Sequence, residues 1–304
     1  MIDFPVLPSG KKPVWNGEYF QIETDSTRVL AYSTNFAGWD DDLTELHEAE
    51  AGDGEHPIDI ASRNAAINAL RRNGFPTNGA VIEIGCSSGF LLQDLKREFP
   101  HAEIVGADIV VKPLERLGAS LPGIPFVQMD LLQCPFAEQQ FDAVIALNVL
   151  EHIEDDAAAL TKMAGLLKPG GILILEVPQG PALYDYYDAY LRHFRRYGKK
   201  GLAAKIAAAG LQLQKLDFLG FIPYPPFWAV KKLNRLRFGL RGEKSPRIEE
   251  MVREQIKVTA KSKILEMCFS VEKALAQKIS FPVGIRCTVV ARPNVSNDVK
   301  VGHA

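Results

Sequence analysis

Three carboxylates stand at the ends of apolar stretches in the first half of the chain. Glu83 lies just before a glycine turn, Asp108 ends the stretch AEIVGAD, and Asp130 follows the stretch FVQM. Ionised carboxylates only accept hydrogen bonds, so Asp108 suits the two hydroxyls of a ribose and Asp130 suits the exocyclic amine of adenine. Because the carboxyl ends of parallel strands meet at one edge of a sheet, the three acids predict a nucleoside pocket there rather than three separate helix caps.

The stretch VIEIGCSSGF at 81–90 is the element that positions the first of these acids. Its first four residues are typical of a short buried strand, and the glycine turn GCSSG follows. Apolar residues then recur at helical spacing as far as Phe99. A strand, a glycine turn and a helix in this order are typical of the ligand crevice of a doubly wound sheet, where a ligand approaches bare backbone.

The same alternation continues along the chain. Strands are predicted at 102–108, 126–129, 141–148, 172–177 and 211–219, with helices at 111–121, 154–167 and 198–209 between them. A last strand is predicted at 284–291. Strands separated by helices pair in parallel through right-handed crossovers. We therefore expect an α/β fold with a doubly wound, seven-stranded, mostly parallel sheet.

The pattern divides the chain into five segments. Residues 1–79 are predicted to form an N-terminal extension or lid, with strands at 19–22 and 28–32 and helices at 43–51 and 58–72. Residues 80–220 form the core, and 221–280 form a mainly helical insertion before the last core strand at 281–293, with one long helical stretch at 248–278. Pro223, Pro225 and Pro226 argue against a continuous helix at the start of this insertion. Residues 294–304 are predicted to be a frayed tail.

The composition excludes several classes of protein. The chain has 304 residues, a net charge of −2 and 47% hydrophobic residues, so no overall charge recruits DNA. Its start lacks the pattern of a signal peptide and no apolar run has membrane-spanning length, so we expect a cytoplasmic protein. The four cysteines form no CxxC pair and are predicted to be reduced thiols. His47 and His56 lie among acids without repeated ligand spacing, so no metal site is predicted.

The glycine turn discriminates between nucleoside cofactors. A dinucleotide loop needs G-x-G-x-x-G and a phosphate-binding P-loop needs GxxxxGK[ST], and the turn matches neither. Its pattern E-x-G-C-x-x-G resembles the nucleotide loop of class I S-adenosylmethionine-dependent methyltransferases of the small-molecule type. FDAVIALNVLEHIED at 141–155 and LLKPGGILILEVP at 166–178 resemble their fourth-strand and fifth-strand motifs. The resemblance covers about residues 58–220 and the last strand, and it implies a Rossmann-like methyltransferase fold whose last strand runs antiparallel.

The resemblance implies S-adenosylmethionine as the cofactor and S-adenosylhomocysteine as the product. In such a site Asp108 binds the ribose, Asp130 and Leu131 lie at the adenine, and the fourth-strand motif lies beside the methionine part. The cofactor-binding residues that it implies are Glu83, Gly85, Cys86, Ser87, Gly89, Asp108, Ile109, Asp130, Leu131 and Asn148. Ser87 departs from the pattern, because many members of the family carry glycine at this position.

The resemblance also implies methyl transfer to a small-molecule acceptor. The stretch HFRRYGKKGLAAKIAAAGLQL at 193–213 resembles subgroups that act on glycan and lipid-linked acceptors. An acceptor hydroxyl needs a general base. His152 is the first candidate and His193 the second, because histidine titrates near neutral pH. A capping or packing role is the alternative for His152.

Two alternative functions and one surface stay open at this point. An NAD(P)-dependent oxidoreductase has a similar sheet, but this chain lacks the dinucleotide loop and a tyrosine followed four residues later by lysine. A non-catalytic methyltransferase-like binding module would keep the cofactor site without turnover. Basic runs at 192–200 and 231–247 fit an anionic lipid surface, RNA or an ordinary solvated helix face. The oligomeric state is not predicted.

Overall fold

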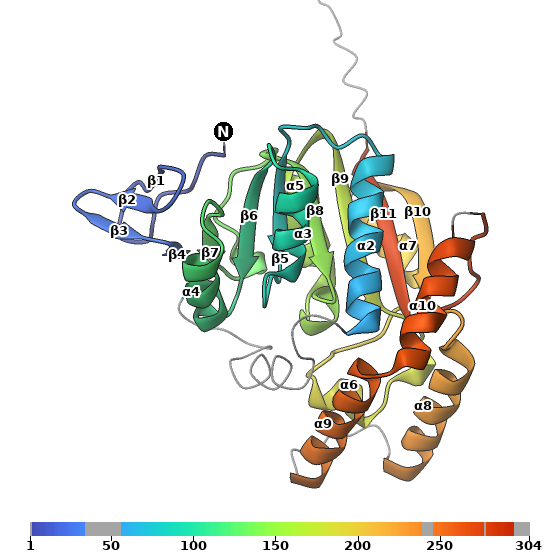
Figure 1. Cartoon of the computed structure of the whole chain (residues 1–304). Helices are drawn as coiled ribbons and strands as arrows, with labels where there is room; N and C mark the ends of the chain where they lie inside the picture. Colours follow the sequence, from blue (N-terminus) through green and yellow to red (C-terminus); the bar gives the residue numbers. More distant parts are fainter. Residues whose placement is uncertain (1, 34–55, 239–245, 277, 295–304) are drawn as a thin grey trace, which may run out of the picture.

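The central feature is a mixed sheet of eight strands in the order β10-β11-β9-β8-β5-β6-β7-β4 (Figure 1). The computed structural model describes residues 2–33, 56–238, 246–276 and 278–294. The strands of the sheet are β4 (Val29–Ala31), β5 (Ala80–Ile84), β6 (Glu103–Asp108), β7 (Phe126–Gln128), β8 (Phe141–Leu147), β9 (Leu167–Pro178), β10 (Leu211–Leu219) and β11 (Arg286–Pro293).

The pairing of the strands confirms the doubly wound α/β fold. β5 pairs in parallel with β6 on one side and with β8 on the other, so the strand order reverses beside it. Such a switch point is where open α/β sheets bind ligands, outside the carboxyl ends of the strands. The last strand, β11, is antiparallel to both β9 and β10, as expected. All seven predicted strands are present, and β4 adds an eighth by pairing in parallel with β7.

Helices cover both faces of the sheet. The side chains of α2 (Pro57–Arg72), α3 (Phe90–Glu98) and α4 (Val111–Ser120) pack with Val81 on one face. Those of α5 (Asp156–Leu166) and α7 (Lys199–Ala208) pack with Ile82 and Ile84 on the other. Successive strand residues point to opposite faces, and both faces are apolar. β5 is apolar except for Glu83, and all five of its residues are buried, as expected for a strand covered on both sides.

The insertion between β10 and β11 forms three helices, α8 (Tyr224–Phe238), α9 (Pro246–Ala260) and α10 (Lys263–Leu275). The prediction that prolines prevent a helix at its start was wrong. Pro225 and Pro226 lie in the first turn of α8, where backbone N–H groups have no intrahelical partner and proline is tolerated. The predicted long helix at 248–278 is two helices, because Ser262 ends the first segment and caps α10 through the backbone N–H of Leu265.

The insertion packs against two different parts of the core. α10 lies against α2, and α9 lies against the short helix α6 (Tyr186–Tyr190). Figure 1 shows α6, α8 and α9 grouped beyond the end of the sheet toward which the parallel strands run. The insertion therefore stands beside the edge of the sheet at which a ligand is expected.

The N-terminal part contributes a separate three-stranded antiparallel sheet made of β1 (Val14–Trp15), β2 (Phe20–Ile22) and β3 (Asp25–Thr27). The predicted strand at 19–22 is β2, and the one at 28–32 is β4. The predicted helix at 43–51 and His47 lie outside the described residues. His56 caps α2 by accepting a hydrogen bond from the backbone N–H of Ile58 at 3.4 Å. The role of residues 1–79 as a lid stays a prediction.

Two further observations concern the chain as a whole. Across the described ranges, none of the helices combines the length and apolar character that crossing a membrane requires. All four cysteines are free, as the sequence predicts, and Cys86 and Cys287 are buried.

Candidate active site

The turn after β5 contains two glycines that no other residue could replace without strain. Gly85 and Gly89 have φ angles of 74° and 73°. A Cβ atom on Gly85 would lie 2.4 Å from Val149 Cγ2, and one on Gly89 would lie 2.6 Å from Leu117 Cδ2. Both positions therefore need glycine for conformation and for space. The first contact also shows that the turn after β5 lies against the segment that follows β8.

Asp108 at the end of β6 faces the glycine turn. The backbone N–H of Ser87 donates to Asp108 Oδ2 at 2.8 Å, and that of Val110 donates to Oδ1 at 3.0 Å. A carboxylate has about four acceptor sites, so acceptor positions are left for a ribose diol. Ser87 has φ +41°, in the left-handed region where glycine is the easiest residue. This conformation explains why a methyltransferase loop commonly has glycine at this position, and Ser87 adopts it here as it binds Asp108.

Glu83 is a buried carboxyl beside this turn. Its side chain is 5% exposed, and within the described ranges Glu83 Oε2 has no hydrogen-bond partner. Burial, followed by the nearby charge of Asp108, raises the pKa of Glu83 well above its ordinary value, although Arg63 opposes the shift. Burial also raises the pKa of Asp108 and of Cys86. The crevice thus contains acidic groups with no neighbouring cation that fully compensates them, which suits a positively charged ligand.

The third predicted acid is at its expected place but has a local role. Asp130 follows β7, and its Oδ1 accepts from the backbone N–H of Leu132 at 2.9 Å, which caps the 3-10 turn η1 (Leu131–Gln133). Its own N–H donates to Ser33 Oγ at 3.1 Å. Ile109 is half-buried and Leu131 is 5% exposed, so apolar side chains accompany both acids at this edge. The adenine contact predicted for Asp130 stays a prediction.

Asn148, at the end of β8, belongs to a buried polar network that the sequence analysis missed. It has φ 55°, and its side-chain Nδ2 donates to Glu176 Oε1 at 3.2 Å. Glu176 is fully buried in β9 and also accepts from Ser62 Oγ at 2.6 Å and from Arg286 Nη1 at 3.2 Å. These bonds connect β8, β9, β11 and α2. Asn148 therefore positions the backbone at the end of β8, and a direct contact with the cofactor stays a prediction.

The structure brings the two predicted catalytic histidines together. His152 ends the 3-10 turn η2 (Leu150–His152) after β8, and His193 lies in the loop after α6. Their ring centroids are 4.6 Å apart and the rings meet edge to face at 79°. The backbone N–H of Phe194 donates to the carbonyl of Glu151 at 2.8 Å and ties the two segments together. Glu151 is 1% exposed, and burial raises its pKa to about 8.

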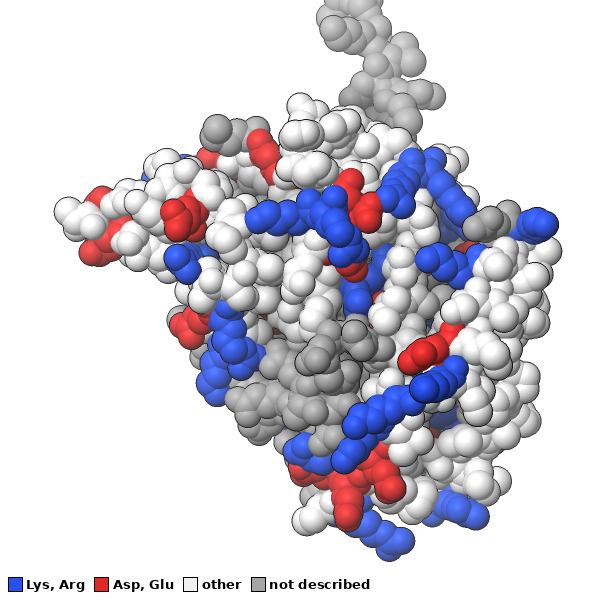
Figure 2. Space-filling model, in the orientation of Figure 1, with Lys and Arg blue, Asp and Glu red and all other residues white. Residues whose placement is uncertain are grey.

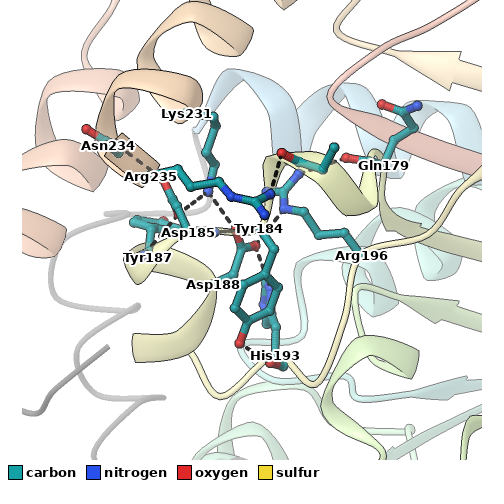
Figure 3. Close-up of polar contacts among 11 residues, drawn as sticks. Gln179, Tyr184, Asp185, Tyr187, Asp188, His193, Arg196, Lys231, Asn234 and Arg235 are labelled. Atoms are coloured by element: carbon teal, nitrogen blue, oxygen red, sulfur yellow. Dashed lines mark hydrogen bonds and ion pairs between the residues drawn. The ribbon is translucent and has the colours of Figure 1, made fainter. Parts of the chain in front are cut away.

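His193 is held by a buried network of charges (Figure 3). Its Nδ1 lies 3.0 Å from Asp188 Oδ1, which also accepts from Arg196 Nε at 2.8 Å. Lys231 of α8 donates to Asp188 Oδ2 at 2.8 Å and to Asp185 Oδ1 at 2.7 Å. Figure 3 shows Lys231 and His193 on opposite sides of the two aspartates. The insertion thus orients His193 through one buried aspartate.

The charges in this network largely compensate one another. Asp185 and Asp188 are fully buried and Lys231 is 2% exposed. Burial alone raises the pKa of Asp188, but Arg196, His193 and Lys231 together bring it well below its ordinary value. Burial lowers the pKa of His193, although Asp188 opposes the shift. His193 is therefore neutral near pH 7, with its tautomer set by the aspartate.

Comparison with known proteins assigns the glycine turn and the following strands to a family. Residues 82–175 match the family model described as a methyltransferase domain. This part of the chain is a class I S-adenosylmethionine-dependent methyltransferase domain. An uncharacterized methyltransferase of Mycobacterium bovis is 33% identical over 104 residues, which is 34% of this chain and 52% of the relative. The chain thus spans about half the length of this curated relative.

Solved structures support the fold of the methyltransferase domain. The [4+2]-cyclase SpnF superposes with a TM-score of 0.54 and 16% identity, covering 83% of this chain and 93% of that one. Phosphoethanolamine N-methyltransferase 2 of Haemonchus contortus, in complex with S-adenosyl-L-methionine, superposes with a TM-score of 0.53 and 15% identity, covering 83% and 57%. At this level of identity the likeness establishes the fold, and function has to be argued from the site.

Much of the acceptor side lies outside the methyltransferase domain. Asp185, Asp188, His193, Arg196 and Lys231 all follow residue 175. Sequence reasoning found His193 but missed both aspartates, Glu151 and Lys231. The capping box of α6, in which Asp185 and Asp188 cap each other's backbone, was a readable signal for a helix start. It did not indicate a buried charge network, because Lys231 comes from a distant helix.

Part of the basic run at 192–200 supports the structure of the domain. In the basic run at 192–200, Arg196 is buried against Asp188, and Arg195 pairs with Asp156 at 2.9 Å, so neither side chain is available as a binding surface. The hydroxyl of Tyr197 lies 3.0 Å from Asp156 Oδ2.

A surface hollow of about 370 Å³, lined in part by Asn78, Ala80 and Glu103, lies at the amino ends of β5 and β6, away from the residues of the site.

Proposed function

We propose that the protein transfers a methyl group from S-adenosylmethionine to a hydroxyl of a small-molecule acceptor. The observation that supports this most is that the glycine turn after β5 lies against the segment after β8 that leads to His152. Gly85 in the first turn approaches Val149, two residues before Glu151, so closely that a side chain does not fit. A group bound at the glycine turn would thus lie next to the histidine pair, as methyl transfer requires.

On the cofactor side, the residues present fit S-adenosylmethionine. Asp108, already turned toward the glycine turn, would accept from the ribose hydroxyls. Backbone groups of Gly85, Cys86, Ser87 and Gly89 would border the methionine part, and Ile109, Asp130 and Leu131 would border the adenine. When bound, the cofactor supplies an activated methyl group with a good leaving group. The protein mainly aligns the two reactants and excludes water.

On the acceptor side, His152 and His193 are proposed to activate the hydroxyl. A hydroxyl is a weak nucleophile until it loses its proton, whereas an amine or an activated carbon needs less help. A buried histidine oriented by a carboxylate is the arrangement that such activation uses. One of these histidines would accept the hydroxyl proton, and the bound cofactor would supply the methyl group to the acceptor oxygen and leave as S-adenosylhomocysteine. The histidine pair therefore favours O-methylation.

Calorimetry and turnover separate this proposal from its alternatives. Titration with S-adenosylmethionine, S-adenosylhomocysteine and NAD is expected to show binding of the first two only. Incubation with labelled cofactor and a panel of hydroxylated acceptors, with mass detection of the added methyl group, is expected to find a product. Binding of NAD alone would support the oxidoreductase. Binding of both sulfur nucleosides without any methylated product would support a non-catalytic module.

The buried acid in the crevice predicts a pH dependence of cofactor binding. Glu83 holds a proton more tightly in the free protein than an exposed glutamate does, because burial raises its pKa. S-adenosylmethionine has a sulfonium and an ammonium group but only one carboxylate, so its net positive charge favours the ionised form of Glu83. Binding should therefore release a proton, and affinity should rise as the pH increases through the raised pKa of Glu83.

The measurement is calorimetry in buffers with different heats of ionisation. Wild-type protein is expected to release protons on binding, and Glu83→Gln is expected to release fewer. Equal proton release in the two proteins, or weaker binding at higher pH, would show that Glu83 does not respond to the cofactor.

A specific observation also favours an acceptor presented at an anionic lipid surface. The insertion exposes large apolar side chains, including Leu236 (85% exposed), Ile264 (70%) and Met267 (63%). Lys232 and Arg235 lie on α8 within about one turn of Leu236. Figure 2 shows basic side chains at the end of the molecule where α8 and α9 lie, with a group of acidic ones among them. Apolar groups flanked by Lys and Arg suit a membrane interface.

Co-sedimentation with vesicles tests this acceptor class. Vesicles of mixed neutral and anionic lipids at low salt are expected to retain the wild type and to lose Leu236→Glu. Val14→Glu changes an equally apolar exposed residue on β1 and is expected to keep binding. Retention of all three proteins would place the lipid contact away from Leu236, and retention of none would argue for an acceptor free in solution.

A further inference from the structure

Three side chains around the histidine pair offer ligand atoms that converge on one point. Oxygen or nitrogen atoms of Glu151, His152 and His193 all lie within 4.8 Å of one another. Glu151 and His152 follow β8, whereas His193 comes from the loop after α6. The sequence did not predict this group, because its third member is brought in only by the fold.

Glu151 carries the first independent sign of a ligand at this point. It is 1% exposed, and within the described part of the chain its Oε2 is buried without a hydrogen-bond partner. A buried carboxyl oxygen without a hydrogen bond is costly, because it has lost its hydration without gaining a partner. The nearby cations Arg286 and Arg196 do not remove this cost, because Arg286 pairs with Asp59 and Glu176, and Arg196 pairs with Asp188. A cation bound beside Glu151 would satisfy the oxygen.

His193 carries the second sign. Its Nδ1 is engaged by Asp188 at 3.0 Å, so Nε2 is the nitrogen left to bind a ligand. Metal-binding histidines almost always use their other ring nitrogen in this way, with a carboxylate that fixes the ring and increases its basicity. Asp188 is in turn held by Arg196 and Lys231. A histidine without a ligand would not need a carboxylate that is itself held by two cations.

We propose that Glu151, His152 and His193 bind one divalent transition-metal ion, which holds the acceptor hydroxyl. Two imidazoles and one carboxylate form a donor set that zinc and related ions accept while keeping positions open for another oxygen. Ligand atoms about 2.1 Å from an ion lie about 3.4 Å apart in tetrahedral geometry, so this group has to contract by at most about 1.4 Å.

The role of the ion rests on the proposed methyl transfer, whereas its binding does not. A bound divalent ion stabilises an ionised hydroxyl, so the acceptor loses its proton to water before it attacks. In this arrangement the two histidines are ligands of the ion in place of the direct base role given above, and Asp188 and Lys231 position one of them. The insertion that carries Lys231 would thereby influence the chemistry without touching the acceptor.

Cobalt binding tests the site without needing the acceptor. Tag-free protein is dialysed against EDTA and then against metal-free buffer, and is titrated with Co²⁺ while the visible absorption is recorded. We expect one Co²⁺ per chain, a ligand-field absorption band, and loss of the band on addition of Zn²⁺. Glu151→Gln and His193→Ala should abolish the band. Asp188→Asn should weaken binding by about 10–100-fold, because the orienting carboxylate is lost.

His101→Ala is the matched control, since it removes an exposed histidine outside the site and should leave the band unchanged. Titration of every variant with S-adenosylhomocysteine shows that it is folded, and it separates failure of this proposal from failure of the proposed function. Absence of saturable Co²⁺ binding in a wild type that binds the nucleoside would overturn the metal site. Equal Co²⁺ binding by the wild type, Glu151→Gln and His193→Ala would overturn it as well.

Discussion

Replacing Asp108 with alanine is expected to weaken the binding of S-adenosylhomocysteine by about 10²–10³-fold. The carboxylate is proposed to accept two ribose hydroxyls, and each hydrogen bond to a charged group contributes about 1.5–3 kcal/mol. Partial compensation by water brings the total to about 3–4 kcal/mol, and each 1.4 kcal/mol is a factor of ten. The substitution also frees the backbone of Ser87, which now donates to Asp108 at 2.8 Å.

Calorimetry of the wild type, Asp108→Ala and Asp130→Ala measures this difference. We expect Asp130→Ala to lose about tenfold, because one hydrogen bond to an adenine amine is at stake. Asp3→Ala, an exposed acid that pairs with Lys12, serves as the control and should bind as the wild type does. An Asp108→Ala protein with wild-type affinity would place the nucleoside elsewhere.

Replacing His193 with alanine is expected to lower kcat by about 10²–10⁴-fold while the affinity for S-adenosylhomocysteine stays within about twofold. The side chain lies on the acceptor side and is held by Asp188, whereas the proposed cofactor contacts come from β5, β6 and β7. The loss should therefore appear in turnover rather than in cofactor binding. Asp188→Asn should lose less, because the ring keeps a partner of the same shape but not its charge.

Steady-state kinetics with the acceptor found by the mass-detected screen measure both constants. His101→Ala is expected to keep the wild-type kcat. This control shows that losing a histidine elsewhere in the protein does not lower turnover. If His193→Ala turned over at the wild-type rate, neither a direct nor a metal-mediated role in activating the acceptor could stand.

The strands beside the glycine turn were largely predictable from the sequence. Strand ends can be read from apolar runs, and parallel pairing places these ends at one edge, so Glu83, Asp108 and Asp130 were placed correctly along the strands, whereas their contacts with a cofactor stay predictions. Gly85 and Gly89 were implied by the resemblance, and their positive φ angles in the structure show why glycine is needed there. The fourth strand and its motif located His152. Each of these inferences depends on short-range pattern and on a regular topology.

The acceptor side was not predictable in the same way. The partnership of His193 with Asp188, and that of Asp188 with Lys231, joins a loop to a helix of the insertion, and no periodic pattern records such a contact. The prediction about Pro225 and Pro226 failed because the rule against proline applies to helix interiors and not to the first turn. β4 was predicted as a strand, but pairing with β7 depends on tertiary structure that its three residues do not encode.

A crystal structure of the protein with S-adenosylhomocysteine would locate the nucleoside. We expect it across the carboxyl ends of β5 and β6, with both ribose hydroxyls on Asp108 and the sulfur directed toward the turn that contains Glu151 and His152. A nucleoside bound away from this edge, or a ribose that makes no contact with Asp108, would contradict it.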